Sequence, residues 1–100
     1  MTTSAPDILT PSAVAVSFGA DTLIVELADG RSLGVPLDWY PRLAAATDAE
    51  RANWRLVARG GGIHWPDIEE DISVAGLIAG RRSQESIASL TRWRASRGVR

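Results

Sequence analysis

Apolar side chains alternate with polar or small ones through three consecutive segments in the first third of the chain. The alternating apolar positions are Val14, Val16 and Phe18, then Leu23, Val25 and Leu27, then Leu33, Val35 and Leu37. A two-residue period is typical of a strand with one buried face. Gly19-Ala20-Asp21 separates the first two segments, and Asp29-Gly30, a strong hairpin signal, separates the last two. The pattern predicts a three-stranded antiparallel meander.

Helical signals follow the meander. Asp38 is placed to cap a helix that includes residues 39–43, where Pro41 is acceptable because the first-turn amides have no helical partner. Thr47 and Glu50 have the spacing of a capping box, which predicts a second short helix through Asn53.

Alternation returns at Trp54, Leu56 and Ala58, and again over residues 63–65. We expect these segments to be a fourth and a fifth strand that pair as a second hairpin. The glycines at 60–62 lead from one strand to another, whereas a phosphate-binding loop leads from a strand into a helix. The sequence therefore favours a hairpin turn at this point.

An acidic connector follows Trp65-Pro66, and Ser73 then caps a helix over residues 74–79, which Gly80 ends. Carboxylates are favourable near a helix N-terminus, and this electrostatic role is the preferred interpretation. Oxygen ligation of a divalent cation is an alternative, although the spacing is not that of an EF-hand. The carboxylates of the connector are Asp67, Glu69, Glu70 and Asp71.

His64, the single histidine, is expected to face away from Ile63 and Trp65, at the solvent side of its strand. A catalytic histidine needs a nucleophile or a polarised substrate beside it. The chain has no cysteine and no serine in a nucleophile-elbow context. A small metal-dependent enzyme that uses His64 and the connector is therefore the least favoured class, and we expect no catalytic residue, no metal and no cofactor.

The last twenty residues differ from the rest in charge. Residues 1–80 contain five arginines and eleven acids, whereas residues 81–100 contain six arginines and one acid, Glu85. Ser83 is placed to cap a helix from Gln84 to about Arg94, with an apolar stripe at every third position. The residues proposed to contact a partner are Ile87, Leu90, Trp93, Arg92, Arg94 and Arg97.

Four tryptophans are many for 100 residues, and we expect three of them to hold the fold. Trp93 has three interpretations: contact with a partner or a second copy, packing on its own domain, or stacking on nucleic acid. The residues expected to be structural are Trp39, Pro41, Trp54, Trp65, Pro66, Asp71 and Ser73.

Composition sets the broad class. One hundred residues with 45% hydrophobic and 23% charged side chains predict one globular domain. No apolar run is long enough to span a membrane, and the start of the chain does not resemble a secretory signal. Together with the absence of cysteine, these features predict a cytoplasmic protein. The predicted organisation is a flexible leader (1–12), an α+β domain (13–80) and a basic amphipathic extension (81–100).

Two motifs resemble the bacterial domain-of-unknown-function 2442 family. The first comprises Asp29-Gly30-Arg31 in the meander and the run from Val35 to Leu43. The second comprises Glu50 to Trp54, Ile63-His64-Trp65-Pro66, and Asp71-Ile72-Ser73-Val74. The resemblance covers residues 13–80 and leaves the basic extension outside.

The resemblance implies a small α+β domain with no assigned catalytic centre. Members of the family are often encoded beside small proteins of the domain-of-unknown-function 4160 family, as in toxin–antitoxin pairs. The leading hypothesis is therefore a non-enzymatic protein-binding module, the antitoxin-like partner of a small toxin-like protein encoded by an adjacent gene. A DNA-binding regulator that uses the arginine-rich tail is the alternative, and homo-oligomerisation is compatible with both.

Overall fold

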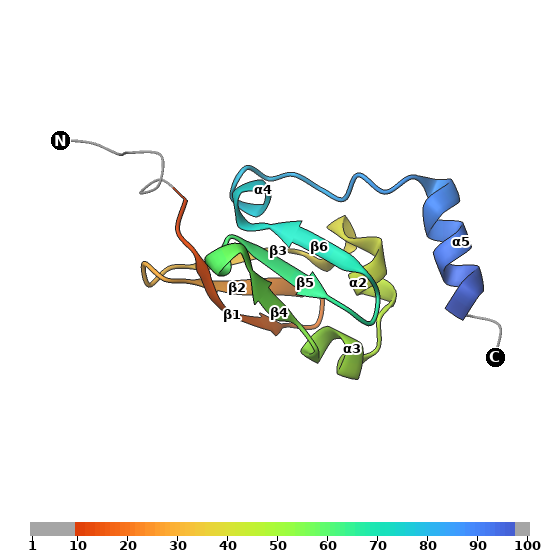
Figure 1. Cartoon of the computed structure of the whole chain (residues 1–100), viewed down its shortest axis with the longest axis horizontal. Coiled ribbons are helices and arrows are strands. Elements are labelled where there is room, and N and C mark those ends of the chain that lie inside the picture. The colour runs from red at the N-terminus through yellow and green to blue at the C-terminus, as the bar shows by residue number, and fades with distance from the viewer. Residues whose placement is uncertain (1–9, 98–100) are drawn as a thin grey trace.

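The computed structural model of the chain describes residues 10–97, whose strands form two antiparallel sheets (Figure 1). The first sheet has the order β1-β2-β3 and the second has the order β4-β5-β6, so each is a meander. The strands are β1 (Ala13–Phe18), β2 (Thr22–Leu27), β3 (Ser32–Pro36), β4 (Arg55–Val57), β5 (Gly62–Trp65) and β6 (Glu70–Ser73). The predicted α+β class is confirmed.

The first meander forms as the alternation predicts, with one exception in β1. Val16 lies opposite Val25, and Leu23 lies opposite Val35, so these side chains share the buried face. The register shifts between Ala13 and Ala15, which leaves Val14 between them 54% exposed and buries Ala13 instead. The prediction that Val14 belongs to the buried face was wrong because a bulge reverses the facing of the residues beside it.

The helices are short except for the last. They are η1 (Leu37–Trp39), α2 (Pro41–Ala45), α3 (Asp48–Ala52), η2 (Ala58–Gly60), α4 (Val74–Ile78) and α5 (Ile87–Arg97). A continuous helix capped by Asp38 was the wrong prediction, because Tyr40 is extended at φ −127° and separates η1 from α2. Pro41 does open α2, and the capping box of Thr47 and Glu50 opens α3 as predicted.

The turn from β4 to β5 lies close to the glycines but begins earlier than predicted. Ala58 and Arg59 both have positive φ, and Gly62 already belongs to β5. Gly60, at φ +83°, lies against the start of β1, where an added Cβ would meet the Ser12 Cβ at 2.7 Å. Glycine is required at this position by both its φ and this close approach.

Strand β6 is the element that the sequence analysis missed. Glu70 pairs with Trp65 and Ile72 pairs with Ile63, so the second half of the predicted acidic connector extends the hairpin to a third strand. Glu69, at φ +52°, lies in the turn before it. Ser73 ends β6 and caps α4 as predicted, because its Oγ accepts a hydrogen bond from the Gly76 amide at 2.9 Å.

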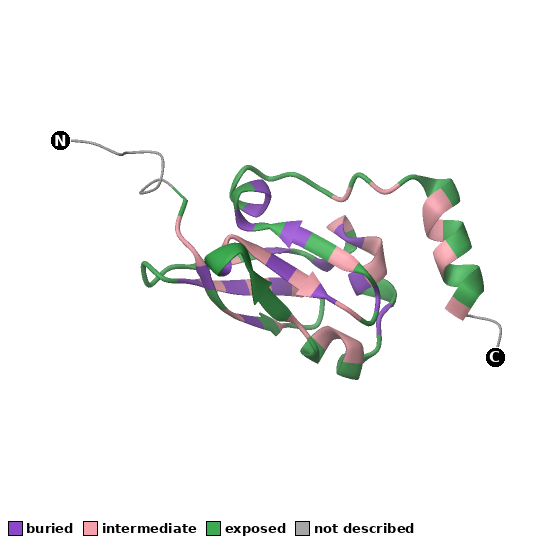
Figure 2. Ribbon diagram, in the orientation of Figure 1, coloured by how far each residue is buried: buried purple, intermediate pink, exposed green. Residues whose placement is uncertain are grey.

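The core lies between the two sheets and includes residues from α2 and α4 (Figure 2). Trp65 is fully buried, as expected of a structural tryptophan, and its indole Nε1 donates to the Arg51 carbonyl at 3.0 Å. Phe18 meets Trp65 edge-on at 6.4 Å between ring centroids, which joins β1 to β5. Trp39 and Trp54 are partly buried at the margin of this core, and Trp54 precedes β4 rather than belonging to it.

A C-terminal arm, residues 79–97, leaves the body, residues 10–78, after α4. It consists of an extended strap, residues 79–86, and α5 (Figure 1). Gly80 has φ +78°, in keeping with its predicted place beyond the helix end. The predicted start of the last helix at Gln84 was wrong: Ser86, not Ser83, accepts the first-turn hydrogen bond, from the Ser89 amide.

Within residues 10–97, no helix combines the length and the apolar character needed to cross a membrane.

Candidate functional site

Charged contacts between the arm and the body centre on Arg42 of α2. Its Nε and Nη2 atoms donate to the Glu85 carboxylate of the strap, with a shortest distance of 2.6 Å. Its Nη1 atom donates to the Ile68 carbonyl at 2.8 Å, and Ser89 of α5 donates to Glu85 at 2.8 Å. The guanidinium holds the pKa of Glu85 below its usual value, so this pair is ionised at neutral pH.

A second bidentate pair ties the far end of α5 to α3. Arg97 donates from both terminal nitrogens to Glu50, at 2.9 and 2.7 Å. Glu50 also accepts from the Thr47 amide in the capping box, so one carboxylate serves both a helix N-terminus and the arm. These contacts, first of all the hydrogen bonds from Arg97, lower the pKa of Glu50 to about 2.

Trp93 lies between these two ion pairs. The Arg42 guanidinium carbon is 5.1 Å from the centroid of the indole, and that of Arg97 is 4.6 Å from it. Cation–π stacking therefore accompanies partial burial of Trp93 against the body core. Of the three interpretations of Trp93, the structure shows packing on its own domain.

Because α5 packs on the body, only part of the predicted apolar stripe of the tail faces the body. Leu90, Trp93 and Arg97 are partly buried on the face toward the body. Ile87 is 85% exposed, and Arg92 and Arg94 are exposed as well. The set of residues proposed to contact a partner thus contains members engaged within the chain and members open to solvent, and its partner role stays a prediction.

The strap is held by main-chain hydrogen bonds and by stacking. The Tyr40 hydroxyl donates to the Arg81 carbonyl at 2.7 Å, and the Ser83 amide donates to the Trp39 carbonyl at 3.0 Å. The Arg82 guanidinium lies 4.9 Å from the centroid of the Trp39 ring. No described residue of the arm is buried, although several are partly so (Figure 2).

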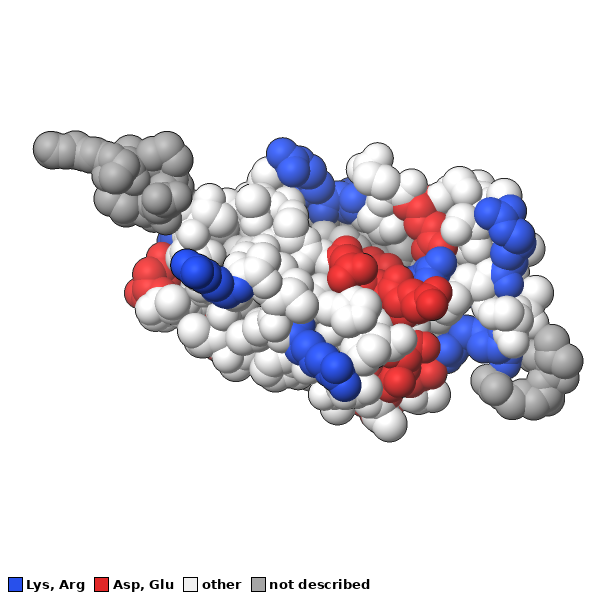
Figure 3. Space-filling model, viewed as in Figure 1, with Lys and Arg blue, Asp and Glu red and all other residues white. Residues whose placement is uncertain are grey.

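The four carboxylates of the predicted connector do not converge. Asp67 accepts from Asn53 at 3.0 Å, while Asp71 lies 2.7 Å from Nδ1 of His64 on the outer face of the second sheet. Glu70 alone shares the inward face with Ile72. Figure 3 shows acidic side chains gathered at the centre of one face, next to the arm.

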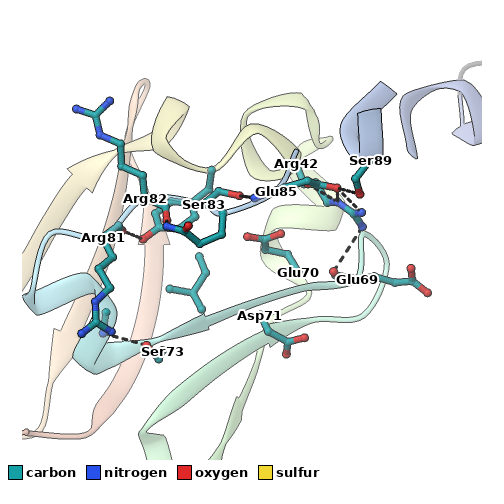
Figure 4. A pocket seen from close by; sticks show the side chains of 14 residues that line it. Arg42, Glu69, Glu70, Asp71, Ser73, Arg81, Arg82, Ser83, Glu85 and Ser89 are labelled. Carbon is teal, nitrogen blue, oxygen red and sulfur yellow. Dashed lines mark hydrogen bonds and ion pairs between the residues drawn. The ribbon is translucent and has the colours of Figure 1, made fainter. Parts of the chain in front are cut away.

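A cleft of about 500 Å³ separates β6 from the strap, and we refer to it as the β6 cleft (Figure 4). Glu70 projects into it, and partial burial raises the pKa of its carboxyl to about 7, against the opposing effect of Arg42. The residues that line it include Tyr40, Arg42, Ile72, Arg82, Ser83 and Gln84.

Sequence reasoning missed Arg42, Glu50, Glu70 and Glu85 as site residues. One indication in the sequence pointed to a specific role for Glu85, since it is the single acid in the basic tail. Arg42 and Glu85 are 43 residues apart, and Arg97 and Glu50 are 47 apart, so no local pattern connects them.

Two solved structures of uncharacterised proteins share this architecture. One, a crystal structure of a protein of unknown function from Rhodospirillum rubrum, is 26% identical with a TM-score of 0.66, covering 75% of this chain and 93% of its own. The other, a solution structure from Chromobacterium violaceum, is 23% identical with a TM-score of 0.68, covering 92% of this chain and 81% of its own. No curated protein matches the chain.

Residues 13–83 match a family described as protein of unknown function (DUF2442). The match begins where β1 begins and ends within the strap, so it contains both sheets and excludes α5. It includes both motifs on which the resemblance rested. The chain therefore belongs to the DUF2442 family.

Proposed function

We propose that the chain is a non-enzymatic protein-binding module whose C-terminal arm is the element that engages the partner. The partner is the small toxin-like protein expected from the adjacent gene, which the chain would neutralise as an antitoxin does. The observation that carries the proposal is the way in which α5 is attached. Helix α5 has no buried residue and is held to the body by the Arg97–Glu50 ion pair and the stacking of Trp93, while the Arg42–Glu85 pair holds the strap before it.

Such an attachment suits an exchange of partners. The two ion pairs are partly shielded, with side chains 11–21% exposed, but both remain in contact with solvent. Charges of this kind can be re-paired or rehydrated on release, so α5 can leave the body at a smaller energetic cost than an element of the apolar core. Leu90 and Trp93 would then join Ile87 in one apolar face. An amphipathic helix that lays such a face into a groove is a recurrent mode of protein recognition.

Co-expression with the product of the adjacent gene tests this proposal. Ile87→Glu places a charge at a position that is 85% exposed, so the variant should fold normally and lose the complex. Val14→Glu is the matched control, because Val14 is also an exposed aliphatic residue but lies in β1. Recovery of an intact complex with Ile87→Glu, and with residues 81–100 deleted, would overturn the proposal.

A DNA-binding regulator is the second candidate, favoured by the exposure of Arg81, Arg82, Arg92 and Arg94 along one arm. Arginines that neutralise phosphates release counterions, so binding of the chain to its own promoter DNA should weaken steeply with salt. Replacing Arg92 and Arg94 by glutamine should reduce the slope of the logarithm of the binding constant against the logarithm of the salt concentration by about two. A flat response to salt excludes this function.

A further inference from the structure

The lining of the β6 cleft combines apolar, polar and charged groups. Its volume of about 500 Å³ is in the range of about 300–1,000 Å³ found for small-molecule sites. Apolar surface comes from Ile72 and from the Tyr40 ring. The strap contributes the Ser83 hydroxyl and the Gln84 amide together with the charged residues Arg81, Arg82 and Glu85. Tyr40 and Ser83 already take part in hydrogen bonds within the chain, to Arg81 and from Glu85 respectively.

Glu70 is the exception in this lining. In Figure 4 its carboxylate points between β6 and the strap, whereas Glu69 and Asp71 point away from that space. Within residues 10–97, no group donates a hydrogen bond to the Glu70 side chain or forms an ion pair with it. Arg42 is close enough to influence it, but the guanidinium is engaged by Glu85 and by the Ile68 carbonyl.

A partly buried carboxylate without a partner is unfavourable, and a cation placed beside it removes that cost. A divalent metal ion is a poor fit, since it would need several oxygen ligands, and within residues 10–97 no group of three or more His, Cys, Asp or Glu side chains is arranged to hold one. An organic cation needs one carboxylate for its charged head and apolar surface for its stem, and the β6 cleft provides both.

We propose that the β6 cleft is a binding site for an organic monocation, an alkylammonium or guanidinium group, with Glu70 as its counter-ion. The stem of the ligand lies along Ile72 and Tyr40, and the strap closes the opposite side. This site is separate from the partner-binding role of α5 and does not depend on it. The same chemistry is carried by free amines and by basic side chains of polypeptides, which the experiment separates.

Protonation of Glu70 competes with the cation, so affinity depends on pH. The charged or titratable groups that surround Glu70 are Tyr40, Arg42, Asp71 and Glu85, with Glu69, Arg81 and Arg82 also lining the cleft. Tyr40 has its pKa raised above the usual value near 10, and Glu85 has its pKa lowered, so neither changes charge between pH 6 and 8. With the pKa of Glu70 at about 7, its ionised fraction rises about tenfold over that interval.

The experiment is a titration of the whole chain, followed by amide NMR shifts, with ethylguanidinium chloride and n-butylammonium chloride at constant ionic strength. We expect saturable shifts confined to β6 and the strap, with affinity about tenfold higher at pH 8 than at pH 6. Glu70→Gln should remove binding, whereas Glu69→Gln, the matched control on the neighbouring outward residue, should retain it.

A second arm titrates the capped peptide acetyl-Gly-Arg-Gly-amide. Binding of both the small cations and the peptide supports a site for the cationic group itself, and binding of the peptide alone assigns the site to an arginine side chain on a polypeptide. Absence of saturable shifts with all three probes overturns the proposal. Equal shifts in Glu70→Gln, or an affinity that does not change with pH in the unmodified chain, overturn it as well.

Discussion

The body and the C-terminal arm are held in place by different forces. The body closes around side chains that lose nearly all contact with water, among them Trp65, Ile63 and Leu43. The arm, by contrast, has no buried residue among those described and attaches through Arg42–Glu85, Arg97–Glu50 and the stacked Trp93. Ionic screening does not weaken apolar burial, whereas it weakens charged contacts, which can also be exchanged for others of the same kind. The body therefore acts as a scaffold, and the arm is the element that can be transferred from the body to a partner.

The largest change in the free energy of unfolding is expected when a large side chain is removed from the core of the body. Trp65→Ala removes a fully buried indole together with its hydrogen bond to the Arg51 carbonyl, and should lower the free energy of unfolding by about 3–5 kcal/mol. Trp93→Ala, the matched change in the arm, should lower it by about 1 kcal/mol. Denaturant unfolding followed by circular dichroism measures both, and equal losses would contradict the distinction between body and arm.

Replacement of Glu70, the acidic residue on the inward face of the second sheet, is expected to raise the free energy of unfolding by a smaller amount. Its pKa of about 7 in the folded chain exceeds the unfolded value of 4.5, so folding is favoured by its protonated form. The stability that this form contributes is complete below pH 4.5 and is lost as the pH rises through about 7. Because the side chain remains partly solvated, Glu70→Gln should stabilise the chain by about 1 kcal/mol at pH 8.

The difference should vanish at pH 4, where both side chains are neutral. Melting temperatures of Glu70→Gln and of the unmodified chain at pH 4 and pH 8 test the sign. A loss of stability at pH 8 on substitution would show that the Glu70 carboxylate is paired in the folded chain.

The smallest effect is expected from the ion pair at the end of the arm. A double-mutant cycle of Glu50→Gln and Arg97→Gln should give a coupling of about 0.5–1 kcal/mol for arm docking, because the pair is partly exposed but bidentate. The pKa of Glu50 is lowered from 4.5 to about 2, so its contribution is complete above pH 4.5 and is lost as the pH falls through about 2.

Amide hydrogen exchange in α5 measures the docking in this cycle and across pH 2–6. The same experiment on β2 is the internal control, since this strand belongs to the core and should not respond. A coupling that is absent, or a change of equal size in β2, would mean that the arm is not a separate unit.

Short-range patterns predicted much of the body but not β6, the third strand of the second sheet. The meander, the Thr47–Glu50 capping box and the Ser73 cap each depend on neighbours a few residues apart, and the structure contains all of them. In β6, however, Glu70 and Asp71 are residue types that occur less often in strands. The free edge of β5 supplied the hydrogen-bonding partners that override this preference.

The candidate sites were less accessible to sequence reasoning than the fold. Ile87 and Trp93 were recognised as one apolar stripe, but nothing local shows that Trp93 lies between Arg42 and Arg97 while Ile87 remains in solvent. The acidic run was recognised as well. Its division into Asp67, Asp71 and the inward Glu70 depends on β pairing, because a strand sends successive side chains to opposite faces.

The sequence by itself determined most of the local elements, most of the buried face of the first meander and the segregation of charge into an acidic body and a basic tail. Only the tertiary structure decided where that tail lies and which carboxylates are left without partners. The physical reason is the range of the interactions. Turns, caps and alternation act between near neighbours, whereas the pairs Arg42–Glu85 and Arg97–Glu50 join residues more than forty positions apart. Both pairs therefore depend on the tertiary fold, which brings these distant residues together.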